Sequence, residues 1–189
     1  WKREGHGIVD MGTAVEESCD VYFYTLALEL GIDRIYAFNN KFNFGKRSGI
    51  DIPGETAGIS PSRQWKRRVK NEAWYPGETL ITGIGQGFNV SSPLQLAYGT
   101  GILANYGLKV RPHLAYAIQD NENEPLRYFE PEIMGVVRIV KKSNWDYIHT
   151  AMQRVVHSNR GTARRIGKTA KYKIAGKTGT AQVYGIKQD

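Results

Sequence analysis

The chain has 189 residues, of which 41% are hydrophobic and 23% are charged, so it can form one domain with a hydrophobic core and is too apolar to be a disordered protein. Its single cysteine, Cys19, excludes an internal disulfide and a Cys-x-x-Cys metal or redox motif. No run of about 18 uncharged apolar residues occurs, so the sequence predicts neither a membrane-spanning helix nor a signal peptide.

The net charge of +8 is concentrated in two basic stretches, at 63–70 and 160–173. Such stretches can contact nucleic acid, an anionic membrane surface or an anionic polymer such as cell wall. Neither stretch matches a nucleic-acid-binding signature, and Trp65 alone offers a stacking surface. A solvated basic face is therefore favoured, and no nucleic-acid partner is expected.

In chain order, apolar residues at helical spacing predict a first helix over 13–30, with Gly31 as its stop. Asp33 is predicted to cap a short helix that ends near residue 40. Glycines and prolines then indicate a loop with short strands over 45–61, with a turn at 51–55. Residues 63–76 lack a clear period and are predicted to be irregular or a short helix.

Ser91 or Ser92 is predicted to cap a second strong helix that has Pro93 at its first position and ends near 106–107. A third helix is predicted over 144–157. Strands are predicted at 110–118 and 135–140, and at 172–184, where β-branched and aromatic residues surround glycines that would let another backbone approach closely. This mixed order has no βαβ rhythm, which favours an α+β fold.

The glycine-rich segment Gly83-Ile84-Gly85-Gln86-Gly87 resembles a phosphate cradle, but its spacing is G-x-G-x-G and no Gly-Lys-Ser/Thr follows. The alternative is a turn that shapes a cleft wall or lets the helix beginning after Ser92 pack closely. The four histidines show no H-E-x-x-H spacing, and the chain contains no G-x-S-x-G elbow.

Two short motifs matter because of their order along the chain. They are Ser18-Cys19-Asp20 early in the chain and Lys177-Thr178-Gly179-Thr180 near its end. Each alone is weak, and the second has an ordinary alternative, a strand that ends in a polar turn. Together they follow the order S-x-x-K, S-x-N or S-x-D, then K-T-G, which is found in serine acyl-transferases that bind penicillin.

The chain resembles the class B penicillin-binding proteins along nearly its whole length, and most of all the elongation-specific penicillin-binding protein 2 group of Gram-negative bacteria. The stretches that carry the resemblance are Gly5–Gly7, Phe44-Gly45, Gly49–Glu55, Trp74–Thr79, Ile84–Gly87, Ser92–Ala97 and Ala175–Val183. The resemblance implies an α+β transpeptidase fold shared with serine β-lactamases, in which a helical cluster packs on an antiparallel sheet. It also implies a D,D-transpeptidase that crosslinks peptidoglycan stem peptides during cell elongation, is a target of β-lactams, and works at the periplasmic face of the inner membrane.

The nucleophile motif is missing. No serine is followed by lysine three positions later, and Ser62 fails because Lys66 is four positions on. The resemblance places that motif before residue 1, and further strands and a final helix after the Lys-Thr-Gly segment. We therefore expect residues 1–189 to be part of a transpeptidase domain, truncated at both ends, anchored through a segment outside the chain and unable to form an acyl-enzyme alone.

Acyl transfer needs a serine activated by a base, a proton route to the leaving amine and donors for the oxyanion. A lysine can act as that base when a second cation nearby lowers its pKa. Lys177 is suited to be that second cation. The resemblance implies that Ser18 hydrogen-bonds between the missing base and Lys177 and relays the proton to the leaving group. The alternative for Ser18 is a capping or helix-kinking hydroxyl.

Four further residues are candidates for substrate binding. Asp20 stands where much of the class has Asn, and its alternative is a solvated acid near a helix N-terminus. Strand alternation places Thr178 and Thr180 on one face, to hold the terminal carboxylate of the substrate, and Lys177 on the other. Gly179 would let an extended peptide pair with the strand edge, and the Thr180 amide would donate to the oxyanion.

Catalysis requires no cofactor, but the resemblance implies a structural zinc bound by His6, Cys19 and acidic residues before residue 1. The alternative for Cys19 is a small buried hydrophobe. The resemblance also implies a polytopic glycosyltransferase of the elongation machinery as a partner, contacted through other regions. Two other functions stay open: a non-catalytic penicillin-binding-like sensor or scaffold, and a β-lactamase of the same fold.

Overall fold

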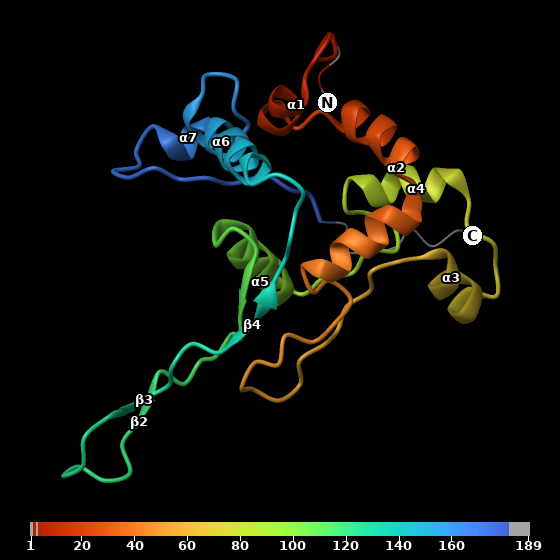
Figure 1. Cartoon of the computed structure of the whole chain (residues 1–189). Coiled ribbons are helices and arrows are strands. Elements are labelled where there is room, and N and C mark those ends of the chain that lie inside the picture. The colour runs from red at the N-terminus through yellow and green to blue at the C-terminus, as the bar shows by residue number, and fades with distance from the viewer. Residues whose placement is uncertain (1, 3, 182–189) are drawn as a thin grey trace.

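The computed structural model describes residue 2 and residues 4–181, and it shows an α+β arrangement of helices with two small antiparallel sheets (Figure 1). This confirms the predicted fold class. The helices are α1 (Met11–Glu17), α2 (Asp20–Lys41), α3 (Arg63–Lys70), α4 (Pro76–Gly83), α5 (Pro93–Ala104), α6 (Ser143–His157) and α7 (Arg164–Gly167). The strands are β1 (Leu108–Val110), β2 (Ala117–Ile118), β3 (Arg127–Tyr128) and β4 (Ile133–Val136). Within this described part, every helix is too short or too polar to cross a lipid bilayer.

The predicted continuous helix over 13–30 is wrong, because the chain breaks at Ser18. Ser18 has left-handed φ and ψ angles of 57° and ends α1, while extended Cys19 leads into α2. The apolar residues keep their helical spacing across the break, so periodicity does not reveal it. Gly31, with φ 72° and ψ 156°, interrupts α2 as predicted, and the helix resumes to Lys41.

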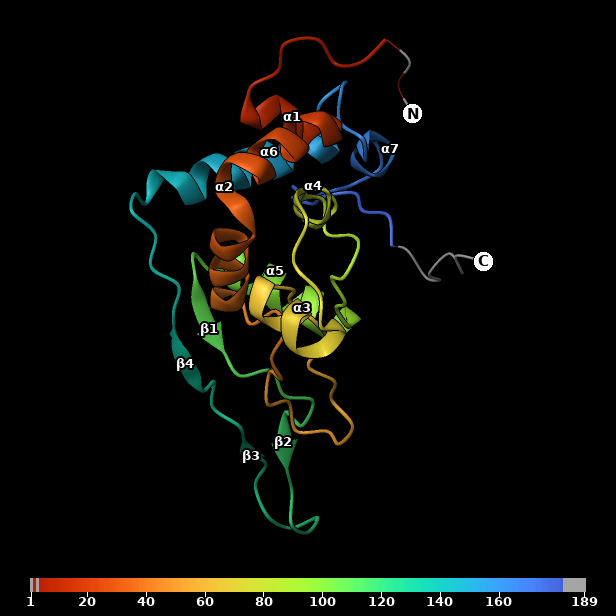
Figure 2. The same ribbon diagram turned by 90° about the vertical axis from the view of Figure 1, so that its right-hand side faces the viewer.

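Two clusters of buried side chains hold the helices together. Val15 of α1 packs against Ala151 and Val155 of α6. The second cluster joins α5, the segment after β4 and α6 through Ile102, Val137 and Trp145. Helix α4 packs against α2, and α1 packs against α6 (Figure 2).

The N-terminus of α5 also fastens the preceding loop. Ser92 caps the helix by accepting a hydrogen bond from the Gln95 amide, and Pro93 is its first residue, as predicted. The buried Gln95 side chain accepts from the Ser92 amide and donates to the carbonyls of Lys46 (3.0 Å) and Ala57 (2.6 Å). One side chain therefore ties both ends of a long loop to α5.

The strand predictions were only partly correct. β1 pairs with β4, and β2 pairs with β3, in an arm that projects from the helices (Figures 1 and 2). The predicted strand at 110–118 is broken in its middle, where Asp51 accepts hydrogen bonds from the amides of Leu114 and Ala115. The predicted strand at 135–140 ends at Val136.

The segment 172–181 of the third predicted strand is not paired with another strand within the described residues. It is fastened to α6 instead, because the Gly176 amide donates to the Met152 carbonyl (3.1 Å) and the Ile174 amide donates to His157 Nε2 (2.9 Å). Residues 182–184 of that prediction lie outside the described part of the chain.

The glycine-rich segment packs on a different helix from the one expected. A Cβ placed on Gly83, the last residue of α4, would lie 2.4 Å from Ala27 Cβ and 3.1 Å from the Phe23 carbonyl oxygen, both in α2. This glycine therefore serves the contact between α4 and α2, and not the packing of the helix that begins after Ser92. No helix was predicted at 76–83, although Pro76 at its first position is a typical helix start.

Candidate active site

The two motifs that lie 159 residues apart meet in space. The Lys177 ammonium donates a hydrogen bond to Ser18 Oγ at 2.8 Å. Ser18 reaches this position because it lies in the break between α1 and α2, and Lys177 reaches it because its segment is fastened to α6. The same ammonium donates to the Thr178 carbonyl at 2.9 Å and approaches Thr178 Oγ1 at 3.4 Å.

The pKa of Lys177 lies below the usual lysine value. Partial burial of the ammonium lowers this pKa, and the charge of the Asp20 carboxylate acts in the opposite direction. Asp20 is the first residue of α2, where the helix dipole favours a negative charge. Its carboxylate is therefore close enough to Lys177 to influence the proton at the centre of the site.

The two faces predicted for 177–180 are not cleanly separated. Lys177 curls back to reach Thr178, and among the residues that the structure describes this segment is not paired with a strand. Thr178 Oγ1 shares a hydrogen bond with Thr162 Oγ1 at 2.9 Å. The space beside the Gly179 Cα is open, as an approaching peptide backbone would require.

Thr180 is exposed, and its carbonyl accepts a weak hydrogen bond from Gln86 Nε2 at 3.4 Å. This bond places the turn after α4 beside the Lys-Thr-Gly segment, and the cleft-wall alternative stays a prediction. Sequence reasoning named Gln86 only as part of a turn, and it missed Thr162. Neither residue has a neighbour in the sequence that signals a contact with residues 178–180.

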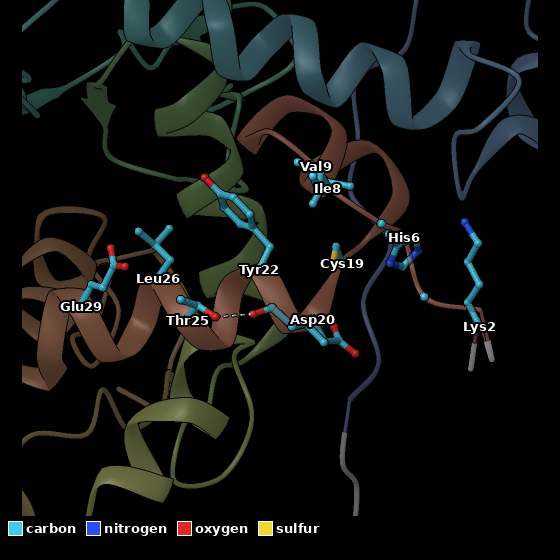
Figure 3. A pocket seen from close by; sticks show the side chains of 13 residues that line it. Lys2, His6, Ile8, Val9, Cys19, Asp20, Tyr22, Thr25, Leu26 and Glu29 are labelled. Carbon is cyan, nitrogen blue, oxygen red and sulfur yellow. Dashed lines mark hydrogen bonds between the residues drawn. The ribbon is translucent and has the colours of Figure 1, made fainter.

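His6 and Cys19 both line an open pocket of about 640 Å³ that also includes Asp20 and the first turns of α2 (Figure 3). Cys19 is buried, and the His6 Nε2 lies 3.8 Å from a carboxylate oxygen of Glu17. Imidazole and thiolate are donors that zinc prefers. Among the described residues, however, no group of three or more His, Cys, Asp or Glu side chains is placed to hold a metal, so these two residues fit only part of such a site.

The α+β fold, in which Ser18 and Lys177 come together, matches the class of penicillin-binding protein transpeptidase domains. The family described as the penicillin-binding protein transpeptidase domain matches residues 1–189, and the chain belongs to this family.

Two curated relatives share one name. The chain is 40% identical over 189 residues to the peptidoglycan D,D-transpeptidase MrdA of Haemophilus influenzae, and 42% identical over 189 residues to the protein of that name from Acinetobacter baumannii. Both alignments cover 100% of this chain, but only 29% and 27% of those proteins. The chain therefore spans less than a third of the length of these relatives.

Solved structures give the same picture. The chain is similar to Pseudomonas aeruginosa PBP2 in complex with WCK 5153, with 49% identity, a TM-score of 0.85, and coverage of 97% of this chain and 40% of that one. It is also similar to Helicobacter pylori PBP2 in its complex with MreC, with 37% identity, a TM-score of 0.80, and coverage of 97% and 32%. These matches extend the resemblance found in the sequence to the path of the backbone.

Proposed function

We propose that the chain is the part of a peptidoglycan D,D-transpeptidase that relays the proton and binds the substrate, and that the parent protein works through an acyl-serine intermediate. The hydrogen bond of 2.8 Å between Lys177 Nζ and Ser18 Oγ carries the proposal. A hydroxyl that accepts from an ammonium keeps its own proton to donate elsewhere. The contact therefore directs the Ser18 proton away from Lys177 and toward the reacting groups.

In the proposed reaction, a serine of the parent attacks the carbonyl between two D-alanine residues of a stem peptide. An ester forms with the enzyme, the amide bond breaks, and the departing amine takes a proton through Ser18. Lys177 stabilises this arrangement as a cation beside the base. A second stem peptide then takes the acyl group, which crosslinks two strands and regenerates the serine.

Residues 178–180 are proposed to bind the substrate. Thr178 and Thr180 are both exposed, and their hydroxyls are suited to hold the terminal carboxylate of a peptide. Open space at Gly179 allows an extended peptide to lie along the segment. We further propose that the Thr180 amide donates to the oxyanion and that Asp20 contacts a substrate amide.

The parent is proposed to act during cell elongation at the periplasmic face of the inner membrane. This rests on the similarity to proteins named MrdA and PBP2. The Helicobacter PBP2 structure is a complex with MreC, and a chain 28% identical to this one belongs to a structure titled as a peptidoglycan synthase complex that coordinates polymerization and crosslinking. We propose a glycosyltransferase of the elongation machinery as the corresponding partner.

A structural zinc held partly by His6 and Cys19 is also proposed, on the grounds that both side chains line one pocket next to Ser18. When bound, the metal would brace the turn that carries Ser18. Elemental analysis of the purified full-length protein tests this directly. One zinc per chain, lost in Cys19→Ser, is expected, and a metal-free but folded protein would end the idea.

The decisive experiment is intact-mass spectrometry of the full-length protein with and without a penicillin, followed by peptide mapping of the adduct. We expect one adduct on a serine outside residues 1–189, formed about 100-fold or more slowly in Ser18→Ala and Lys177→Ala. A folded protein that forms no adduct would favour a non-catalytic sensor or scaffold. Rapid turnover of a cephalosporin would favour a β-lactamase.

A further inference from the structure

Two adjacent carboxylates lie buried directly before Ser18. Glu16 is 2% exposed and Glu17 is 4% exposed, although acidic residues on a helix are normally solvated. A buried carboxylate is retained only when cations and hydrogen-bond donors compensate the loss of water. The partners of these two residues therefore show what holds the end of α1 in place.

Glu16 binds the C-terminal end of α6. Its carboxylate pairs with Arg154 and accepts a hydrogen bond from the Ser158 hydroxyl, two residues about 140 positions further along the chain. The Glu16 main-chain carbonyl also accepts from the Thr162 amide at 3.3 Å. Side chain and backbone of one residue thus hold the segment 154–162 against the end of α1, where Figure 1 shows α1 lying against α6.

Glu17 makes a second set of contacts in a different direction. Its carboxylate pairs with Arg160 and with Lys2 at 3.2 Å, and His6 Nε2 lies 3.8 Å away. The carboxylate is therefore fixed by partners from two segments, one near residue 2 and one near residue 160.

The segment that these carboxylates hold leads straight back to the site. Thr162 shares a hydrogen bond with Thr178, and the next residue toward the N-terminus, Lys177, donates to Ser18. Ser18 itself follows Glu17 in the chain and adopts a left-handed backbone that costs a non-glycine residue about 1 kcal/mol or more. The contacts form a closed circuit, from Ser18 through the two carboxylates to 154–162, and back through Thr178 and Lys177.

We propose that Glu16 and Glu17 are positioning residues that fix the separation between the Ser18 hydroxyl and the Lys177 ammonium. Neither touches the reacting groups. They act by joining the turn that carries Ser18 to the segment that, through Thr162, holds Thr178. This inference rests on the proposed function, because it concerns the rate of the same acylation. A displacement of about 1 Å in such a site can reduce a rate by roughly two orders of magnitude.

The test uses the full-length protein and separates the dissociation constant of the initial penicillin complex from the maximal acylation rate. In Glu16→Gln and Glu17→Gln, we expect the maximal rate to fall by about 10- to 100-fold, since ion pairs that fix the geometry are lost. The dissociation constant is expected to stay within about twofold, because residues 178–180 keep their own contacts with ligand. A loss of fold would instead reduce the fraction of protein that reacts.

Two further variants keep the result interpretable. Arg160→Ala removes a partner of Glu17 whose side chain is 60% exposed, so the protein should fold, and the acylation rate should still fall severalfold. Asp33→Asn is the matched control. It removes an exposed carboxylate of α2 that pairs with Arg63 at 3.1 Å, and the maximal acylation rate should be unchanged.

Unchanged maximal rates in folded Glu16→Gln, Glu17→Gln and Arg160→Ala would overturn the inference, as would a higher dissociation constant with an unchanged rate. A wild-type protein that forms no adduct would overturn the proposed function itself, and this inference with it. The two failures are therefore distinguished by the wild-type measurement.

Discussion

Substitution of Gly83 by alanine probes the contact between α4 and α2. The added Cβ would lie 2.4 Å from Ala27 Cβ, whereas carbon atoms in contact are normally about 3.5–4.0 Å apart. Neither Ala27 Cβ nor the Phe23 carbonyl oxygen, at 3.1 Å, belongs to a flexible side chain, so the helices must separate by roughly 1 Å. Overpacking of this kind costs about 1–3 kcal/mol.

Two effects decide how far Gly83→Ala changes the stability of the protein. Alanine in a helix is favoured over glycine by up to about 1 kcal/mol, which offsets part of the clash. Since the clash is with backbone and a Cβ, we place its cost at the upper end, and the net destabilisation of Gly83→Ala is about 2 kcal/mol. For a domain of this size that corresponds to a decrease in melting temperature of about 4–8 °C.

The assay is thermal unfolding of the full-length protein by circular dichroism. The transition to follow is the one whose melting temperature rises when penicillin is bound. Gly77→Ala is the matched control in the same helix, because a Cβ at Gly77 meets nothing within 4 Å. Its melting temperature should be unchanged or slightly higher. Equal melting temperatures for Gly83→Ala and Gly77→Ala would refute the close approach of α4 and α2.

Three further predictions concern other contacts. Gln95→Leu leaves two loop carbonyls without their donor and should destabilise the protein by about 2–4 kcal/mol in urea unfolding, whereas an unchanged midpoint would contradict that role. Glu78→Gln weakens the 2.5 Å ion pair with Lys66, whose side chain is 1% exposed, and should lower the urea midpoint more than the exposed-acid variant Asp33→Asn does. The acylation rate should fall as rising pH removes the Lys177 proton, with a midpoint below the usual lysine pKa of about 10.4. Because the Asp20 charge raises that pKa, Asp20→Asn should move the alkaline limb to lower pH, and a shift upward would contradict the assignment.

Sequence reasoning succeeded where a local signal and the tertiary contact agree. Ser92 and Pro93 begin α5 because capping chemistry acts within one turn, and the apolar face of 144–157 matches α6 because it packs on α1. The order of the Ser18 and Lys177 motifs predicted their association, which the structure shows as a direct hydrogen bond.

The misses have physical causes that lie outside any local window. The break at Ser18 ends the helix whose Val15 packs against α6, a contact with residues far along the chain, so an uninterrupted apolar stripe could not reveal it. No role was predicted for Glu16 and Glu17, because the cations that pair with them lie in other segments, near residue 2 and at 154–160. The segment after residue 172 has the composition of a strand, but strand formation needs a partner strand, and the described amides of Ile174 and Gly176 donate to α6 instead.

The segment 174–180 is attached at its two ends to different parts of the molecule. Near Ile174 and Gly176 the segment is bonded to α6, which packs against α1. At Thr180 it is bonded to the turn that ends α4, and α4 packs against α2. Ser18 lies where these same two helix pairs join. A small rotation of one pair against the other would therefore displace the segment 174–180 and the contact between Ser18 and Lys177 in a single movement.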